Sequence, residues 1–351
     1  MSAHTTIRRP RLTIPLVLSA CALLAAASAQ LARANSRTPS TTASNRFTLE
    51  TAERDRVLAS IATLLDRDYV FPDVGRKMAA ALRSAEERGT YSDITDGQIF
   101  ALRLNDDLQA INHDEHLGVH FSATVLPPYQ TPETSPAARQ AIFANMLASN
   151  CGFEKVEHLV PNIGYLKIDE FDDPPVCAPI AAAAMGFVAN SDALIIDVRD
   201  NRGGRGTGIL SYLFAKPTHL MDMFSRHDHA IHELWTSPNV AGRKFVGKPV
   251  FVLTSSRTFS DAEAFAYALK TLKRATLIGE TTKGGAHTME IHRIDDHYAI
   301  HVPFGQFISP ITHTDWEGTG VEPDIKVPAA QALDEALRRA RAMTETRPPS
   351  S

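Results

Sequence analysis

The stretch VFVLTSSRTFSDAE runs from Val250 to Glu263 and joins two sequence patterns. It opens with a short apolar run of strand length, and apolar residues at helical spacing begin directly after Ser260. We therefore expect Ser260 at a strand-to-helix turn, where backbone N–H groups without internal partners stabilise an oxyanion. A serine at this place can be a nucleophile, or it can simply cap the helix, with Glu263 completing a capping box.

Length and composition limit the possible classes of protein. The chain has 351 residues, 44% of them hydrophobic, so it can bury one large core or two domains of ordinary size. Its 36 basic and 40 acidic residues give a net charge of −4, without a basic block in the body of the chain. A nucleic-acid partner therefore has no electrostatic support.

The N-terminus has the pattern of an export signal over residues 1–29. Three arginines precede an apolar run from Leu12 to Ala27, which ends at an Ala-Ser-Ala cleavage site. The segment around Cys21 also fits a lipoprotein signal, in which this cysteine would carry a lipid anchor. No other stretch approaches the roughly 20 apolar residues of a membrane span. We expect an exported chain, periplasmic or extracellular, with a disordered lead-in over residues 30–46.

Removal of the signal leaves two cysteines, Cys151 and Cys177. In an exported protein such a pair can form one disulfide, and the alternative is two buried thiols. The sequence alone does not give their separation in space, so both alternatives stay open.

Periodicity divides the rest of the chain into regions. Apolar residues at helical spacing predict an N-terminal helical subdomain over residues 47–125, followed by a proline-marked linker and a helix over 126–150. Apolar and alternating runs that read as strands, separated by helical patterns, predict a larger core over 151–343. Residues 344–351 form the expected tail.

Three histidines lie close together at the end of the helical region, at positions 113, 116 and 120. Neither an H-E-x-x-H spacing nor a cysteine partner accompanies them, so we expect no metal site there. We interpret His116 as a candidate general base, and His113 and His120 as surface residues.

A glycine-rich turn follows the apolar run Ala193–Val198 and contains Gly203 and Gly204. Paired glycines after a buried strand allow the backbone to approach a ligand and to aim an N–H group at it. The spacings of phosphate-binding loops are absent, and a plain tight turn remains an alternative.

Four ordered segments, at 194–204, 250–263, 279–287 and 317–325, together resemble the tail-specific, or C-terminal processing, protease family of serine peptidases. The closer similarity is to the branch of interphotoreceptor retinoid-binding protein and the tricorn protease core. This resemblance implies an α/β fold, with a crotonase-like core of stacked β-β-α units and an N-terminal helical subdomain, and it implies no cofactor. The linker is too short for the PDZ domain that many members insert.

The resemblance also implies the residues of an active site. It makes Ser260 the nucleophile, His116 the base and Glu317 the carboxylate that orients the base. The implied oxyanion donors and substrate-contacting residues are Gly203, Gly204, Asp261, Gly284 and Gly285.

The base has alternatives within this resemblance. The processing-protease branch uses a lysine as the base, at a position that matches Gly285, while Lys283 lies two residues earlier. Lys283 and His287 therefore remain alternatives to His116.

The leading hypothesis is an exported serine endopeptidase that acts on proteins or peptides. The rival is a non-catalytic protein of the same fold that binds an apolar ligand such as a retinoid or a lipid. The presence of Ser260, His116 and Glu317 favours the enzyme, since a histidine can activate a serine hydroxyl and a carboxylate can orient the histidine. We expect the cleft between the helical region and the core, because the base and the nucleophile come from different regions.

Overall fold

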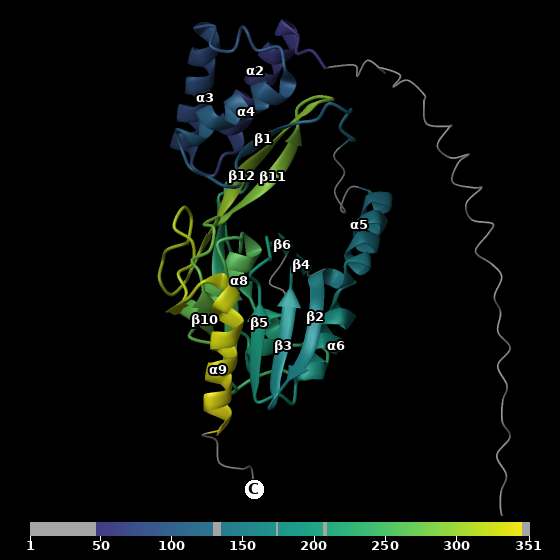
Figure 1. Cartoon of the computed structure of the whole chain (residues 1–351). Coiled ribbons are helices and arrows are strands. Elements are labelled where there is room, and N and C mark those ends of the chain that lie inside the picture. The colour runs from purple at the N-terminus through teal and green to yellow at the C-terminus, as the bar shows by residue number, and fades with distance from the viewer. Residues whose placement is uncertain (1–46, 129–134, 173–174, 206–208, 346–351) are drawn as a thin grey trace, which may run out of the picture. The chain divides into compact units, whose positions relative to one another are not determined.

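A computed structural model describes residues 47–128, 135–172, 175–205 and 209–345 (Figure 1). The expected export signal, the lead-in and Cys21 lie outside the described residues, as do residues 346–351 of the expected tail. No helix among the described residues has both the length and the apolar character that crossing a membrane requires.

The described residues contain both helices and strands. The helices are α2 (Thr51–Asp68), α3 (Pro72–Glu87), α4 (Gly97–Gln109), α5 (Pro136–Ala148), α6 (Ala178–Val188), α7 (Leu210–Leu213), α8 (Asp261–Thr271) and α9 (Ala332–Glu345). The strands are β1 (Gly118–Phe121), β2 (Phe153–Leu159), β3 (Ile163–Ile168), β4 (Phe171–Asp172), β5 (Ala193–Asp197), β6 (Gly204–Arg205), β7 (His219–Ser225), β8 (Ala230–Trp235), β9 (Val250–Thr254), β10 (Thr276–Gly279), β11 (His287–Arg293), β12 (Tyr298–Ile308) and β13 (Ile325–Lys326). The mixed α/β class is confirmed, and α9 includes the first two residues of the expected tail.

The larger sheet carries the strand that leads to Ser260. Its strands lie in the order β13-β10-β9-β5-β3-β2, with parallel pairing except between β2 and β3. Parallel strands that are covered on both faces have nearly continuous apolar sequences. All residues of β5 and β9 are buried, and these two strands are neighbours in the sheet.

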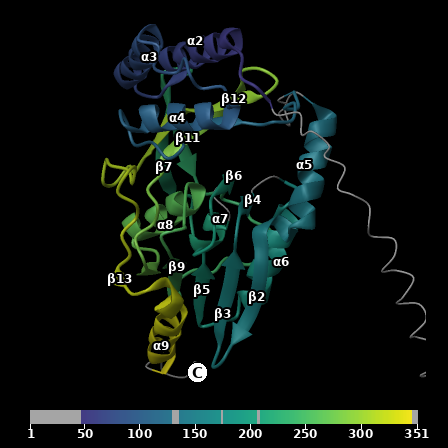
Figure 2. The same cartoon turned by 45° about the horizontal axis from the view of Figure 1, so that its top comes forward.

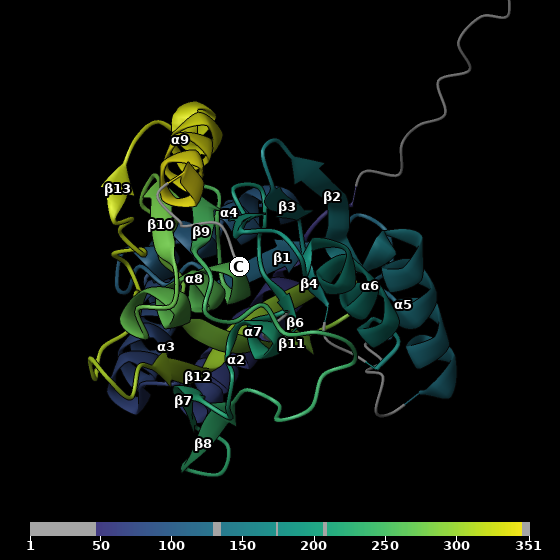
Figure 3. The same ribbon diagram turned by 90° about the horizontal axis from the view of Figure 1, so that it is seen from below.

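Helices cover both faces of this sheet (Figure 3). On one face, Ala336 of α9 packs in a core that includes Ile195. On the other face, Phe265 of α8 packs in a core that includes Ile196. Because neighbouring residues of a strand point to opposite faces, β5 contributes to both cores. The turn at Ser260 is therefore held by a central strand before it and a packed helix after it.

The N-terminal helices share their core with strands from the far end of the chain. Strand β12 pairs with β1, β7 and β11, and α2, α3 and α4 lie beside this smaller sheet (Figure 1 and Figure 2). The buried residues of this core include Ile61 and Phe100 from the helices and Tyr298, Ile300 and Val302 from β12. The helical subdomain expected over residues 47–125 is thus closed by a strand from the C-terminal region.

A disulfide joins Cys151 and Cys177, whose Cα atoms are 5.7 Å apart. Both cysteines are buried. The expectation of one disulfide is confirmed, and the alternative of two buried thiols is wrong for this structure.

Candidate active site

Ser260 occupies the turn between β9 and α8 in an unusual backbone conformation. Its φ is 56° and its ψ is −124°, a region that residues other than glycine rarely adopt. The Ser260 N–H donates a hydrogen bond of 2.9 Å to Oε2 of Glu263, which is the carboxylate half of the expected capping box. A serine on a strained strand-to-helix turn is the arrangement that exposes the hydroxyl of a nucleophile.

The hydroxyl of Ser260 faces the imidazole of His116. The distance from Oγ of Ser260 to Nε2 of His116 is 3.0 Å, although the two residues are 144 positions apart in the chain. The imidazole stacks on the ring of Phe259, with centroids 4.6 Å apart and an interplanar angle of 22°. The structure therefore brings together the expected nucleophile and the expected base at hydrogen-bond distance.

Burial controls the charge of His116. It lowers the pKa of His116 to about 4, although the nearby carboxylate of Asp114 acts in the opposite direction. The imidazole is therefore neutral at pH 7, and its Nε2 can accept a proton. Its other nitrogen, Nδ1, is buried and has no hydrogen-bond partner within the described ranges.

Glu317 does not take the position expected for it on Nδ1 of His116. Its Oε2 instead accepts a hydrogen bond of 2.5 Å from the N–H of Ala286 and lies 3.6 Å from Nδ1 of His287. The loop that carries Glu317 is tied to the glycine-rich segment, because the N–H of Gly318 donates to the carbonyl of Gly284. This tie directs the carboxylate toward His287. Burial raises the pKa of Glu317 to about 7.

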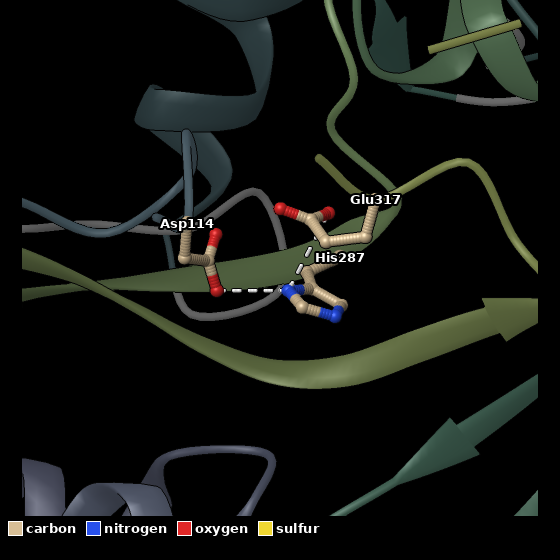
Figure 4. Close-up of side chains that lie close together, drawn as sticks. All are labelled: Asp114, His287 and Glu317. Atoms are coloured by element: carbon tan, nitrogen blue, oxygen red, sulfur yellow. Dashed lines mark hydrogen bonds and ion pairs between the residues drawn. The ribbon is translucent and has the colours of Figure 1, made fainter. Parts of the chain in front are cut away.

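Asp114 and His287, which are buried, and Glu317, which is partly buried, form a group of titratable side chains (Figure 4). Nδ1 of His287 donates to Oδ2 of Asp114 over 2.8 Å. The hydrogen bond and the charge of Asp114 raise the pKa of His287 despite its burial, which acts in the opposite direction. The hydrogen bond and charge of His287 lower the pKa of Asp114, again against the effect of burial.

The separation between these atoms fits a hydrogen bond better than a metal site. Two atoms that bind one tetrahedral zinc ion at about 2.0–2.1 Å lie about 3.3 Å apart. Nδ1 of His287 and Oδ2 of Asp114 are closer than that, at 2.8 Å. A second group of ligand-type side chains, His219, Asp222 and Glu233, lies on the β7–β8 hairpin, away from the serine. We therefore interpret the first group as hydrogen-bonded charges.

The glycine-rich segment after β10 is anchored by one buried carboxylate, that of Glu263. Its oxygens accept from the N–H of Gly284 at 2.7 Å, the N–H of Gly285 at 2.9 Å and Oγ1 of Thr282 at 2.5 Å. The N–H groups of the two glycines are thus engaged inside the protein. If these glycines contact a substrate, as the resemblance implies, they do so through other atoms.

Lys283 pairs with a carboxylate other than those of the serine turn. Its Nζ lies 2.8 Å from Oε2 of Glu115 and 4.7 Å from the centre of the Phe259 ring. His287 likewise bonds to Asp114 through the nitrogen described above. Of the three alternatives for the base, His116 is the residue whose side chain lies within hydrogen-bond distance of Ser260 among the described residues.

The paired glycines at the start of β6 include Gly203, which packs against the serine turn. A Cβ atom on Gly203 would lie 2.8 Å from Cβ of Ser260 and 3.1 Å from the backbone nitrogen of Asp261. The N–H of Gly203 donates to Oδ1 of Asn201 over 2.8 Å. Because this donor is already used, Gly204 is the better candidate for an oxyanion donor from this segment.

Part of this site could not be recognised from the sequence. Asp114 lies two residues before His116, but we assigned it no role, since one buried carboxylate has no sequence signature of its own. Asp114 is fully buried, and its partners Tyr69 and His287 are 45 and 173 positions away. The stretch N-H-D-E-H was the available signal, because it places an acidic residue beside the candidate base.

Comparison with known families gives two adjoining matches. Residues 162–327 match peptidase family S41, and residues 47–157 match the N-terminal domain of peptidase S41 in eukaryotic interphotoreceptor retinoid-binding protein. The chain is 29% identical over 224 residues to carboxyl-terminal-processing peptidase 2, chloroplastic, of Arabidopsis thaliana, covering 62% of this chain and 42% of that protein. It is 31% identical over 169 residues to putative tricorn protease homolog 2 of Streptomyces coelicolor, covering 45% of this chain and 14% of that protein.

Solved structures show the same fold. A lipoprotein from Streptococcus agalactiae superposes with a TM-score of 0.55 and 17% identity, over 82% of this chain and 96% of that one. A putative peptidase from Parabacteroides merdae superposes with a TM-score of 0.57 and 16% identity, over 84% of this chain and 98% of that one. The chain spans less than half the length of the curated relatives that it matches.

Proposed function

We propose that this chain, which belongs to peptidase family S41, hydrolyses peptide bonds of proteins or peptides with Ser260 as the nucleophile and His116 as the base. The observation that carries the proposal is the distance of 3.0 Å between Oγ of Ser260 and Nε2 of His116. A serine hydroxyl is a poor nucleophile at neutral pH and needs an adjacent base to take its proton.

The reaction follows from this pair of side chains. His116 accepts the hydroxyl proton at Nε2 while Oγ of Ser260 attacks the carbonyl carbon of the scissile bond. The N–H groups of Gly204 and Asp261 are the proposed donors to the oxyanion, and each such donor contributes on the order of 3 kcal/mol to the transition state. His116 then gives its proton to the leaving amine, and water releases the acyl group from Ser260 by the same steps in reverse.

Glu317 keeps a place in the proposal, but not the one implied by the resemblance. Its carboxylate lies against His287 rather than against His116, so it acts on the base through the charges between them. Gly203 lies against the serine turn and Gly285 against the imidazole, while Gly284 packs against the loop that follows Glu317.

The proposed location of the enzyme is outside the cytoplasm. The Cys151–Cys177 disulfide supports this, because structural disulfides persist in oxidising compartments and are rare in the cytosol of ordinary cells. The export signal pattern of residues 1–29 points to the same conclusion, and the choice between a cleaved signal and a lipid anchor at Cys21 stays a proposal.

Hydrolysis of an unfolded protein tests the proposed function. The wild-type chain should degrade reduced, alkylated casein, and Ser260→Ala and His116→Gln should each remove this activity while leaving the folded protein intact. A variant of a distant serine, Ser122→Ala, is the matched control and should keep the wild-type rate. An apolar-ligand carrier would show no hydrolysis in any of these proteins, and that result would reject the proposal.

A further inference from the structure

Asp114, a residue that the proposed reaction leaves unused, connects three parts of the molecule. Its Oδ2 accepts hydrogen bonds from the hydroxyl of Tyr69 and from Nδ1 of His287, each with a length of 2.8 Å. Its Oδ1 accepts from the backbone N–H of His116 over 3.0 Å. A single buried carboxylate thus bonds to helix-end residue Tyr69, to the start of β11 and to the main chain of the base.

We propose that Asp114 and His287 are positioning residues for the base. Asp114 fixes the main chain that carries the imidazole of His116, and His287 balances the negative charge of Asp114 beside that imidazole. This inference rests on the proposed function, since it takes His116 to be the base.

The anchoring role of Asp114 follows from the hydrogen bonds that hold the turn before β1. Besides the contact to the N–H of His116, the carbonyl of Asp114 accepts from Nε2 of Gln109 over 2.8 Å and from the N–H of Leu117 over 3.1 Å. The ring of His116 is held separately by its stacking on Phe259. Because the main chain and the ring are both fixed, Nε2 has little freedom to leave the serine. Misplacement by about 1 Å can cost a factor of about 100 in rate.

The charge-balancing role of His287 follows from the charged groups around the imidazoles of His116 and His287. His116 faces Asp114, His287, Lys283 and His301, and His287 faces Asp114, Glu317 and Asp315. A buried carboxylate without a counter-charge is costly and would also favour the charged form of a neighbouring imidazole.

The charge on His287 offsets that of Asp114. When its imidazole is protonated, the pair is neutral overall, and this favours the uncharged form of His116, which is the form that a base requires. The hydrogen bond of 2.8 Å to Asp114 favours this protonated form. Burial raises the pKa of Glu317 to about 7, so its carboxyl is mostly protonated at the acidic pH values where the base loses activity, and it does not disturb this balance there.

Two substitutions separate these roles. The acidic limit is the pH below which the rate falls because His116 is protonated. His287→Gln keeps a donor next to Asp114 but removes the positive charge, so this acidic limit should move upward by about one pH unit. Asp114→Asn removes the negative charge, and the buried His287 then loses the interaction that holds its proton. The net charge near His116 stays almost the same, so the acidic limit should not move upward, while the loss of the anchor should lower the rate at every pH by about tenfold or more.

The measurement is the rate of inactivation by a fluorophosphonate between about pH 3.5 and 8.5, which needs no knowledge of the substrate. In this reaction, Oγ of Ser260 forms a bond to phosphorus, His116 takes the hydroxyl proton, and fluoride leaves as the P–F bond breaks. His292→Gln is the matched control, because His292 also faces carboxylates, Asp68 and Glu290, and lies on the same strand β11. It should keep the wild-type profile.

The outcomes separate this inference from the proposed function. An unreactive wild-type serine would reject the proposed function itself. A reactive wild type with the same acidic limit in His287→Gln and His292→Gln would overturn the charge-balancing role, and a full rate in Asp114→Asn would overturn the anchoring role. A further measurement needs no variant: the ¹⁵N shifts of the His287 ring should be those of an imidazolium at pH 6, and neutral-ring shifts would contradict the proposal.

Discussion

A Cβ atom placed on Gly285 would lie 2.8 Å from Cε1 of His116, closer than Cβ atoms approach their neighbours. The main chain of Gly285 cannot easily move away, because its N–H donates to Glu263 and its carbonyl accepts from Nε1 of Trp316. The resemblance to the lysine-dependent branch implies that the lysine of that branch would stand at position 285. The imidazole of His116 and a side chain at this position therefore compete for the same space.

This crowding predicts the effect of Gly285→Ala. The added methyl group must displace either His116 or Phe259, whose ring atom Cε2 would be 2.3 Å away. We expect the rate of peptide hydrolysis to fall at least about tenfold, because the base loses its alignment.

Gly186→Ala is the matched control for this substitution. It lies in α6, and no atom is within 4 Å of the added Cβ. It should keep full activity and raise the free energy of unfolding by up to about 1 kcal/mol. A wild-type rate in Gly285→Ala would show that the site tolerates a shifted imidazole.

The choice of base predicts opposite results for two substitutions. Lys283→Met should retain most of the activity, because its ammonium group pairs with Glu115 in a partly exposed ion pair, while His116 holds the hydrogen-bond contact with Ser260. His116→Gln should reduce kcat to a residual level of roughly a thousandfold over the uncatalysed reaction. Steady-state kinetics on one peptide substrate compare the two, and the reverse order of activities would assign the base to Lys283.

The raised pKa of Glu317 predicts a pH-dependent effect on stability. The folded pKa is about 7 and the ordinary value is 4.5, so the folded state binds the proton more tightly than the unfolded state. The favourable contribution of Glu317 is fully present below about pH 4.5 and is lost as the pH rises through about 7. Glu317→Gln should therefore raise the free energy of unfolding at pH 8.5, by at most about 3 kcal/mol, and change it little at pH 5. Urea unfolding at the two pH values measures this, and an equal effect at both would show that the carboxylate is not penalised by burial.

The disulfide makes a separate prediction for stability. The two cysteines are 26 positions apart, and closing a loop of this size stabilises a folded chain by about 3 kcal/mol. Cys151→Ala together with Cys177→Ala should lower the free energy of unfolding by about that amount without changing the pH profile of hydrolysis. Two free thiols found by mass spectrometry in the native wild-type protein would contradict the pairing.

The sequence was most informative where a structure is set by local pattern. The apolar run and the helical spacing around Ser260 predicted the strand, the turn and the helix, because each depends on residues close in the chain. The same holds for the buried strand Ala193–Asp197 and for the glycines that follow it. The positive φ of Ser260 was not predictable, since it comes from the packing of the turn between β9 and α8.

Contacts between distant segments could not be read from the sequence. Strand β12 closes the core of the N-terminal helices, and no local pattern shows that its buried face belongs with them. The position of Glu317 depends on the bond from Ala286, which exists only once two loops have met. The resemblance implied that this carboxylate orients His116. In the structure the bond from Ala286 holds the carboxylate beside His287 instead.

The intact mass of the protein after reaction with a fluorophosphonate tests the central claim most directly. If Ser260 is activated by His116, the wild-type chain should gain the mass of one phosphonyl group, and a fragment containing Ser260 should carry it. Ser260→Ala should gain no mass, and His116→Gln should react far more slowly because the base is missing. A label on another residue, or an unmodified wild-type chain, would contradict the account.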